Sequence, residues 1–133
     1  MTRLTWREGG GFEEAAAYSR AVRIGSHVAV SGTAPMDDGV VLHPGDAYAQ
    51  ASTAIAKALA AAAQLGARPE DVIRTRLLLA VGSDWEAVVR AHREAFAGID
   101  PANTSYYVAG FIPEGVLVEF ELDAILPEAE PPR

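Results

Sequence analysis

The sequence predicts an α+β fold in which two helices pack on one face of a mixed sheet. Two segments, 46–65 and 84–97, repeat apolar residues at the three- and four-residue spacing of a helix. The last apolar segment, 116–126, instead alternates at the two-residue period of a strand. With the remaining strand-like segments the order is ββ(β)αβαββ, which is typical of helices layered on a sheet.

The strand predictions rest on apolar runs bounded by turn residues. We expect strands at residues 3–6, 21–24, 27–33, 40–42, 72–81, 103–109 and 116–126. Gly25-Ser26 suits the tight turn of a hairpin, and Asp37-Asp38-Gly39 marks another turn. Residues 110–115 are predicted to join the last two strands as a third, short hairpin loop.

Both helices carry start and stop signals. Asp46 is the expected N-cap of the first helix, and Gly66 is the residue that ends it. Ser83 and Glu86 are three residues apart, which predicts a capping box at the start of the second helix. Gly98 ends that helix. Its inner stripe is expected to be Trp85, Val88, Val89, His92 and Phe96.

Length and composition limit the classes of function. The chain has 133 residues, which fits one domain over residues 1–133 with a core of about 12–126. It has no cysteine, so disulfides and Cys-ligated metals are excluded, and its three histidines match no metal template. The net charge of −7 argues against a nucleic-acid partner. We expect no signal peptide, no membrane span and a cytoplasmic location, and we expect residues 127–133 to fray.

The last strand predicts a sheet with two different faces. One face is apolar, and the other holds three carboxylates, Glu119, Glu121 and Asp123. On segment 72–81, Arg74 and Arg76 also share one face, so the two rows suit ion pairs within the sheet or across an interface. Alternatively, a partly buried row of this kind holds a functional site with perturbed pKa values. A face without helices needs cover, and another subunit would supply it.

Three segments resemble the RidA/YjgF family, also described as endoribonuclease L-PSP-like. They are YSRAVRIGSHVAVSGTAP at 18–35, QASTAIAKALAAAAQLGARPEDVIRTRLLLA at 50–80, and DWEAVVRAHREAFAGIDPANTSYYVAGFIPEGVLVEFELDAIL at 84–126. The resemblance implies a chorismate-mutase-like (YjgF-like) subunit, a homotrimeric barrel and small-molecule clefts between subunits. It implies hydrolysis of 2-aminoacrylate-type enamines and imines to 2-keto acids and ammonia, without cofactor or metal.

The resemblance also implies site residues. Glu119 falls at the family's strand glutamate, which would position water and move a proton; alternatively it belongs only to the acidic row. Tyr18 falls at the family's cleft tyrosine, or it packs on the core. Ser31 and Gly32 would bring backbone close to a ligand, or they form an ordinary strand end.

One departure from the family concerns Asn103. The deaminating members read Pro-Ala-Arg-Ser/Thr where this chain has Pro-Ala-Asn-Thr, and their arginine clamps the substrate carboxylate. Asparagine carries no charge, which suits a neutral imine better. The backbone N–H of Ser105 would still orient a ligand oxygen, and Tyr107 would narrow the cleft or add a hydroxyl.

The sequence leaves two questions open. Arg20, Arg74 and Arg76 are the candidates to replace the missing arginine, and the sequence places none of them beside Asn103. The function is either an imine or enamine deaminase, or a non-catalytic protein that binds or senses a small metabolite. Ribonuclease activity is disfavoured by the acidic charge.

Overall fold

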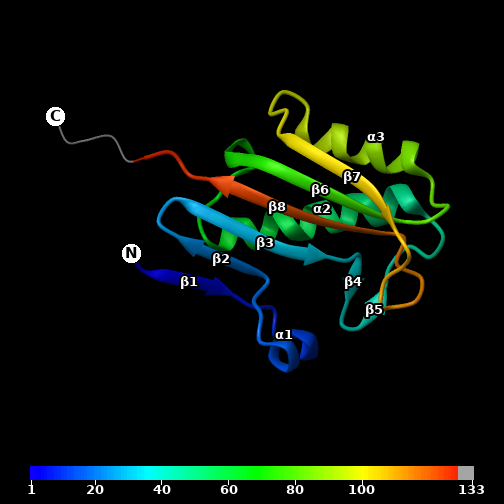
Figure 1. The fold of residues 1–133 in the computed structure, drawn as a ribbon, viewed down its shortest axis with the longest axis horizontal. Coiled ribbons are helices and arrows are strands. Elements are labelled where there is room, and N and C mark those ends of the chain that lie inside the picture. The colour runs from blue at the N-terminus through cyan, green and yellow to red at the C-terminus, as the bar shows by residue number, and fades with distance from the viewer. Residues whose placement is uncertain (129–133) are drawn as a thin grey trace.

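The computed structural model describes residues 1–128 as a sheet with its two long helices on the same side (Figure 1). The expected tail lies mostly outside the described residues. The elements are β1 Arg3–Trp6, α1 Gly11–Ala16, β2 Ala21–Ile24, β3 His27–Thr33, β4 Met36–Asp37, β5 Val40–Val41, α2 Ala47–Gln64, a 3₁₀ turn Pro69–Asp71, β6 Val72–Ala80, α3 Trp85–Phe96, β7 Ala102–Val108 and β8 Val118–Ile125. The predicted α+β class with a mixed sheet is therefore confirmed.

The main sheet has the strand order β1-β2-β3-β8-β6-β7, and β4 pairs with β5 in a separate ribbon. Only β6 and β7 run parallel; the other neighbours are antiparallel. The predicted hairpin between the last two strands is wrong, because β6 lies between them. The segment that joins them crosses the end of β6, where Ala80 N–H donates to the Leu117 carbonyl (2.9 Å) and Val81 N–H to Val108 (3.3 Å).

The predicted N-cap is confirmed for α2 and wrong for α3. Asp46 caps α2 as expected, since its carboxylate accepts a hydrogen bond from Ala49 N–H at 3.0 Å. The N-cap of α3 is Asp84, which accepts from Ala87 N–H at 3.2 Å. Ser83 was expected in that role, but its hydroxyl donates to the Ala80 carbonyl at 2.6 Å and tightens the preceding turn.

The core lies between the sheet and the two helices. Small alanines let α2 pack closely on β3 and β8, and the largest fully buried apolar side chains are Phe96, Phe120, Leu77, Leu122, Val28, Val88 and Val118. The expected inner stripe of α3 is wrong for Trp85 and Val89, which are 54% and 47% exposed. They line an open cavity between α3 and the β6–β7 part of the sheet, which leaves them partly exposed.

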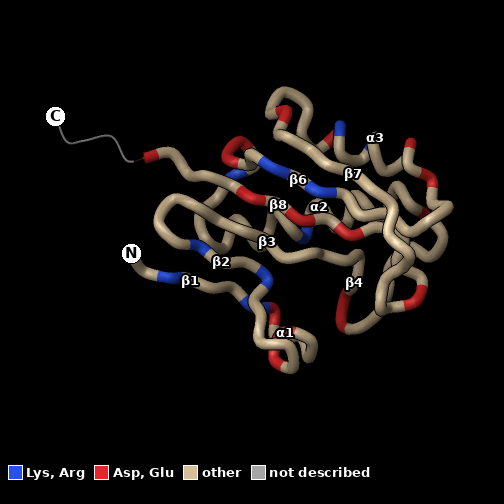
Figure 2. The backbone as a smooth tube through the Cα atoms, viewed as in Figure 1, with Lys and Arg blue, Asp and Glu red and all other residues tan. Residues whose placement is uncertain are grey.

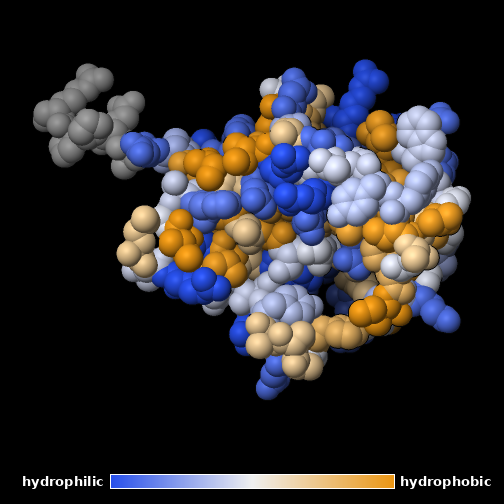
Figure 3. Space-filling view, viewed as in Figure 1, coloured by the Kyte–Doolittle hydropathy of each residue, from blue (hydrophilic) through white to orange (hydrophobic). Residues whose placement is uncertain are grey.

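Within residues 1–128 no long helix covers the opposite face of the sheet, and this face carries the charged rows, which Figure 2 shows on β6 and β8. Arg76 pairs with Glu121 at 3.1 Å, in the predicted register. Arg74 lies opposite Asp123 but donates to the Thr104 hydroxyl (3.1 Å), and Asp123 contacts His27 (3.4 Å). Hydrophilic side chains fill the middle of this face, with apolar ones on both sides (Figure 3).

Two short features surround one end of this face. Helix α1, which the glycine run concealed from the sequence patterns, begins at Gly11 and follows β1. The β4–β5 ribbon turns at residues 38–39, as the Asp-Gly signal predicts.

In the part of the chain that the structure describes, no helix is long and apolar enough to cross a bilayer.

Candidate functional site

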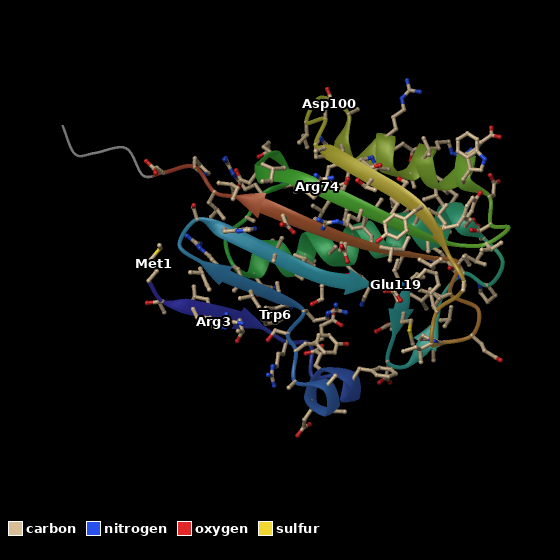
Figure 4. All side chains as sticks on the ribbon, viewed as in Figure 1. Met1, Arg3, Trp6, Arg74, Asp100 and Glu119 are labelled. Atoms are coloured by element: carbon tan, nitrogen blue, oxygen red, sulfur yellow. The ribbon has the colours of Figure 1, made fainter. Side chains whose placement is uncertain are left out.

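A cavity of about 360 Å³ opens beside the end of β3, where Glu119 of β8 lies (Figure 4). Its walls come from α1, the segment before β2, the end of β3, the starts of β4 and β8, one residue of α2 and the 110–113 loop. The lining residues are Glu8, Phe12, Tyr18, Arg20, Gly32, Ala34, Met36, Lys57, Gly110, Phe111, Ile112, Pro113 and Glu119. Three residues singled out from the sequence, Tyr18, Gly32 and Glu119, therefore share one cavity.

Gly32 makes room for the Glu119 carboxylate. A Cβ atom built on Gly32 would lie 2.9 Å from Oε1 of Glu119, closer than real contacts allow. The constraint is one of space, because Gly32 is not among the positive-φ glycines. Any larger residue at position 32 would push the carboxylate from its place.

The charge on Glu119 is not neutralised by an ion pair. Burial raises the pKa of the Glu119 carboxyl above its ordinary value, the positive charge of Arg20 opposes this shift, and the charge of Glu121 adds to it. Glu121 is matched by Arg76, whereas among residues 1–128 no cation lies within 4 Å of the Glu119 carboxylate. A half-buried carboxyl without a salt-bridge partner is suited to accept and return a proton.

This electrostatic environment predicts a pH-dependent gain in stability for Glu119→Gln. Since the pKa is raised in the folded state, ionised Glu119 destabilises the fold, and the cost vanishes below the unfolded value of 4.5, where both states are protonated. The variant should therefore exceed the wild type in melting temperature at pH 7–8, with the gap closing as the pH falls toward 4. Melting curves across this range test it; a gap independent of pH would contradict the electrostatic cause.

Arg20 and Tyr18 lie next to each other on the cavity wall. The guanidinium of Arg20 donates through Nη2 to the Gly32 carbonyl at 2.7 Å and lies 5.7 Å from the centre of the Tyr18 ring. Ser31 does not line the cavity. Its hydroxyl donates to the Ser19 carbonyl at 2.6 Å, so its side chain ties β3 to the segment before β2.

The other three candidate residues lie elsewhere in the protomer. Asn103, Ser105 and Tyr107 are on β7, on the helix side of the sheet. Ser105 and Tyr107 line a second, largely apolar cavity of about 300 Å³, together with Leu77, Leu79, Trp85, Val88, Val89 and Tyr106. Within one protomer these residues cannot act on a ligand beside Glu119.

The Asn103 amide is occupied by neighbouring side chains. Its Nδ2 donates to the Thr75 hydroxyl at 3.0 Å, and its Oδ1 accepts from Ser105 at 2.8 Å. Thr75 in turn lies 2.8 Å from Nε2 of His92, whose pKa is lowered by burial. The Asn103 side chain is therefore engaged by Thr75 and Ser105 within its own protomer. The prediction of His92 as a core histidine fits these contacts.

Gln50 holds together loops next to the cavity by hydrogen bonds, and the sequence patterns did not predict this role. It is fully buried on α2, and its Nε2 donates to the carbonyls of Leu42 (3.2 Å), His43 (3.3 Å) and Gly115 (2.9 Å). Its Oε1 accepts from Leu117 N–H at 2.8 Å. One amide thus holds both ends of the loops around the cavity. An isolated glutamine on an apolar helix face was the available signal.

Comparison with known proteins identifies the family. The model of the family described as Endoribonuclease L-PSP matches residues 11–126. An uncharacterized protein of Streptomyces coelicolor is 40% identical over 118 residues, covering 89% of this chain and 88% of that protein. The chain therefore belongs to the endoribonuclease L-PSP family, which is the RidA/YjgF family expected from its motifs.

Solved structures share the fold. A crystal structure of Rv2704 from Mycobacterium tuberculosis, a member of the YjgF/YER057c/UK114 family, has a TM-score of 0.85 and 38% identity, covering 94% of this chain and all of that one. TdcF of E. coli, solved with bound serine, has a TM-score of 0.75 and 21% identity, over 92% of this chain and 94% of its own. The likeness to TdcF is one of fold. No group of three or more metal-ligating side chains occurs within residues 1–128.

Proposed function

We propose that this protein hydrolyses the C–N bond of a small imine or enamine, with Glu119 as the general base and acid. The observation that carries the proposal is the unpaired, half-buried Glu119 carboxylate on the wall of a cavity that also holds Tyr18 and the backbone of Gly32. Membership in the family supports it, and the serine bound to TdcF indicates a ligand of similar size in that relative.

The chemistry needs one water and one mobile proton. Glu119 takes a proton from water as the oxygen adds to the imine carbon, which gives a carbinolamine. The carboxyl returns that proton to nitrogen and then moves the proton of the carbinolamine hydroxyl to the same nitrogen, so that the C–N bond breaks as the carbonyl forms and imine and water become ketone and ammonia. Burial raises the pKa of the Glu119 carboxyl, which makes it a stronger proton acceptor in this exchange.

We further propose that the working form is a homotrimer whose clefts join the Glu119 cavity to β7 of the next subunit. The uncovered sheet face and the position of Ser105 and Tyr107 on the far side of the protomer support this arrangement. Sedimentation at equilibrium should then give about 42 kDa, three times the chain mass of 14.0 kDa. A mass of one chain at micromolar concentration would exclude a cleft shared between subunits.

The activity is tested with freshly generated 2-aminoacrylate and with a neutral imine, by measuring ammonia and keto-product release above the buffer rate. Release from either substrate supports hydrolysis, and the ratio of the two rates shows the preferred class. The absence of any rate above buffer with both would overturn the deaminase proposal.

A non-catalytic binding or sensing protein is the second candidate. It is favoured by Asn103, whose side chain carries no charge and is held by Thr75 and Ser105. Its signature would be a rise in melting temperature with an imine or keto acid and no ammonia release. Cleavage of RNA, which the family description names, is not proposed because the chain carries a net charge of −7.

A further inference from the structure

We infer that Arg20 is a positioning residue for Glu119, because its guanidinium braces a β-bulge in β3 that makes room for the Glu119 carboxylate. The inference rests on the proposed function of Glu119 and goes beyond it, since that proposal gives Arg20 no role. Arg20 acts here on the protein itself, through the Gly32 carbonyl, and not on the ligand.

The end of β3 contains one residue more than the part of β8 that it pairs with. Val30 lies opposite Leu122 and Thr33 lies opposite Phe120, so three steps along β3 match two steps along β8. An extra residue of this kind shifts the side-chain alternation of its strand and redirects the residues next to it.

The bulge places Gly32 beside Glu119. In a regular strand, position 32 would share the face of Val30, which is buried in the core. With the extra residue, a Cβ on Gly32 would instead meet Oε1 of Glu119 at 2.9 Å. The conformation of the bulge therefore decides whether the Glu119 carboxylate has room in its present place.

The segment before β2 holds the bulge. Within residues 1–128, neither strand register gives Ser31 or Gly32 a partner residue. Ser31 instead donates its N–H to the Arg20 carbonyl (2.9 Å) and its hydroxyl to the Ser19 carbonyl (2.6 Å). The Gly32 carbonyl accepts from Nη2 of Arg20 at 2.7 Å. Arg20 thus binds both residues of the bulge, one through its backbone and the other through its side chain.

The place of Arg20 is fixed by its own neighbours. Its N–H donates to the Trp6 carbonyl of β1 at 2.8 Å, and its guanidinium lies 5.7 Å from the centre of the Tyr18 ring. The hydrogen bond of its guanidinium goes to the backbone of the bulge and not to Glu119. Burial raises the pKa of the Glu119 carboxyl, and the positive charge of Arg20 opposes this shift, so the two side chains also interact through space.

The test compares Arg20→Met with Arg20→Lys. Methionine keeps an unbranched side chain but has neither donor nor charge, whereas lysine keeps the charge and lacks the planar guanidinium. Arg20→Met should lower kcat for ammonia release from 2-aminoacrylate by about 10-fold or more, since small displacements of a catalytic group cost about 10- to 100-fold. Its KM should stay within about twofold of the wild type, and Arg20→Lys should have an intermediate kcat.

The titration of Glu119 supplies a readout that a merely structural role of Arg20 would not move. NMR of isotope-labelled glutamate carboxyl carbons follows it without turnover, and Glu119→Gln identifies the signal by its loss. In Arg20→Met the midpoint should lie at higher pH than in the wild type, because the opposing positive charge is gone. In Arg20→Lys it should stay near the wild-type pH. The other charged or titratable side chains around Glu119 are the same in all variants: Glu8, Tyr18, Lys57, Arg76 and Glu121.

The matched control is Arg23→Met. Arg23 is a half-buried arginine on β2 that also donates to backbone carbonyls, those of Gly25 (2.8 Å) and Leu65 (2.7 Å), but it does not line the cavity. This variant should lose stability and keep both kcat and the Glu119 midpoint of the wild type. Equal losses of kcat in the two methionine variants would overturn the inference.

Three further results would contradict the inference. They are an unchanged kcat in Arg20→Met, a lowered kcat with an unmoved Glu119 midpoint in that variant, and full recovery of kcat in Arg20→Lys, which would assign the effect to charge alone. If Arg20→Met does not fold, Arg20→Lys decides, with the wild-type kcat as the contradicting result.

Failure of this inference is distinguishable from failure of the proposed function. If the wild type releases no ammonia, the deaminase is rejected, and the Glu119 midpoint in Arg20→Met then decides the inference, with the wild-type midpoint overturning it. If the wild type is active and Arg20→Met matches it in kcat and midpoint, the inference is rejected and the proposed function stands.

Discussion

Glu119→Gln is expected to lower kcat for imine hydrolysis by about 100-fold or more, which is the usual contribution of a positioned general base. Glutamine preserves the size of the side chain next to Gly32, where a Cβ would lie 2.9 Å from Oε1. It cannot take a proton from water or return one to nitrogen. Steady-state ammonia release from 2-aminoacrylate measures the effect, and substrate affinity should change much less than kcat.

Glu121→Gln is the matched control for that experiment. Glu121 lies two residues further along β8 on the same face, but it is paired with Arg76 at 3.1 Å and does not line the cavity. It should retain kcat within a few-fold. The reverse pattern, with loss of activity in Glu121→Gln and retention in Glu119→Gln, would show that the wrong carboxylate of the row has been assigned.

Gln50→Leu is expected to reduce the free energy of unfolding by about 3 kcal/mol or more. Leucine fills a similar volume but leaves the Leu42, His43 and Gly115 carbonyls and the Leu117 N–H without their buried partner. Each such group costs about 1–3 kcal/mol, and relaxation of the loops recovers part of the sum. Urea unfolding followed by circular dichroism gives the difference.

Gln64→Leu makes the same chemical change at the exposed end of α2 and should stay within about 0.5 kcal/mol of the wild type. Equal effects of the two substitutions would mean that the Gln50 contacts contribute nothing specific. Because the loop that Gln50 holds continues into residues 110–113 of the cavity wall, Gln50→Leu should also weaken ligand binding.

Local patterns predicted most of the elements. Asp46 as a cap, Gly25-Ser26 as a turn and the pairing of Arg76 with Glu121 all depend on neighbours in sequence or on the two-residue period of a strand. Strand pairing over longer distances was predicted less well. A short loop after β7 looks like a hairpin from sequence alone, and only the insertion of β6 between β7 and β8 shows that it is not.

Packing determines which residues of a helix are buried, and the sequence periodicity alone did not predict this. Trp85 and Val89 have helical spacing on α3, yet they line an open cavity beside β7 and stay about half exposed. Helix α1 has only six residues and begins in a glycine run, so no apolar period marks it. The helical periodicity of apolar residues identifies one face of a helix, but it does not say whether another element covers that face.

The candidate site was predictable only in its outline. The two-residue period places Glu119 on the charged face, and the family motifs bring attention to Tyr18 and Gly32. The place of Arg20 on the cavity wall depends on a hydrogen bond to the Gly32 carbonyl, 12 residues away, which no sequence pattern specifies. The engagement of Asn103 with Thr75 likewise depends on the parallel pairing of β6 with β7.

The cavity has one wall of residues on or next to paired strands and another made by α1 and the 110–113 loop, and this difference affects how ligand specificity can change. Glu119, Gly32 and Arg20 are fixed by strand pairing and by each other, so substitutions there alter the chemistry itself. Phe12 and Ile112, at 60% and 89% exposure, come from a short helix and a loop with few packing demands. Changes in these two segments alter which ligands fit while the charged wall stays intact. Under the proposed function, changes in α1 and the 110–113 loop would therefore alter the ligand while Glu119 stays in place.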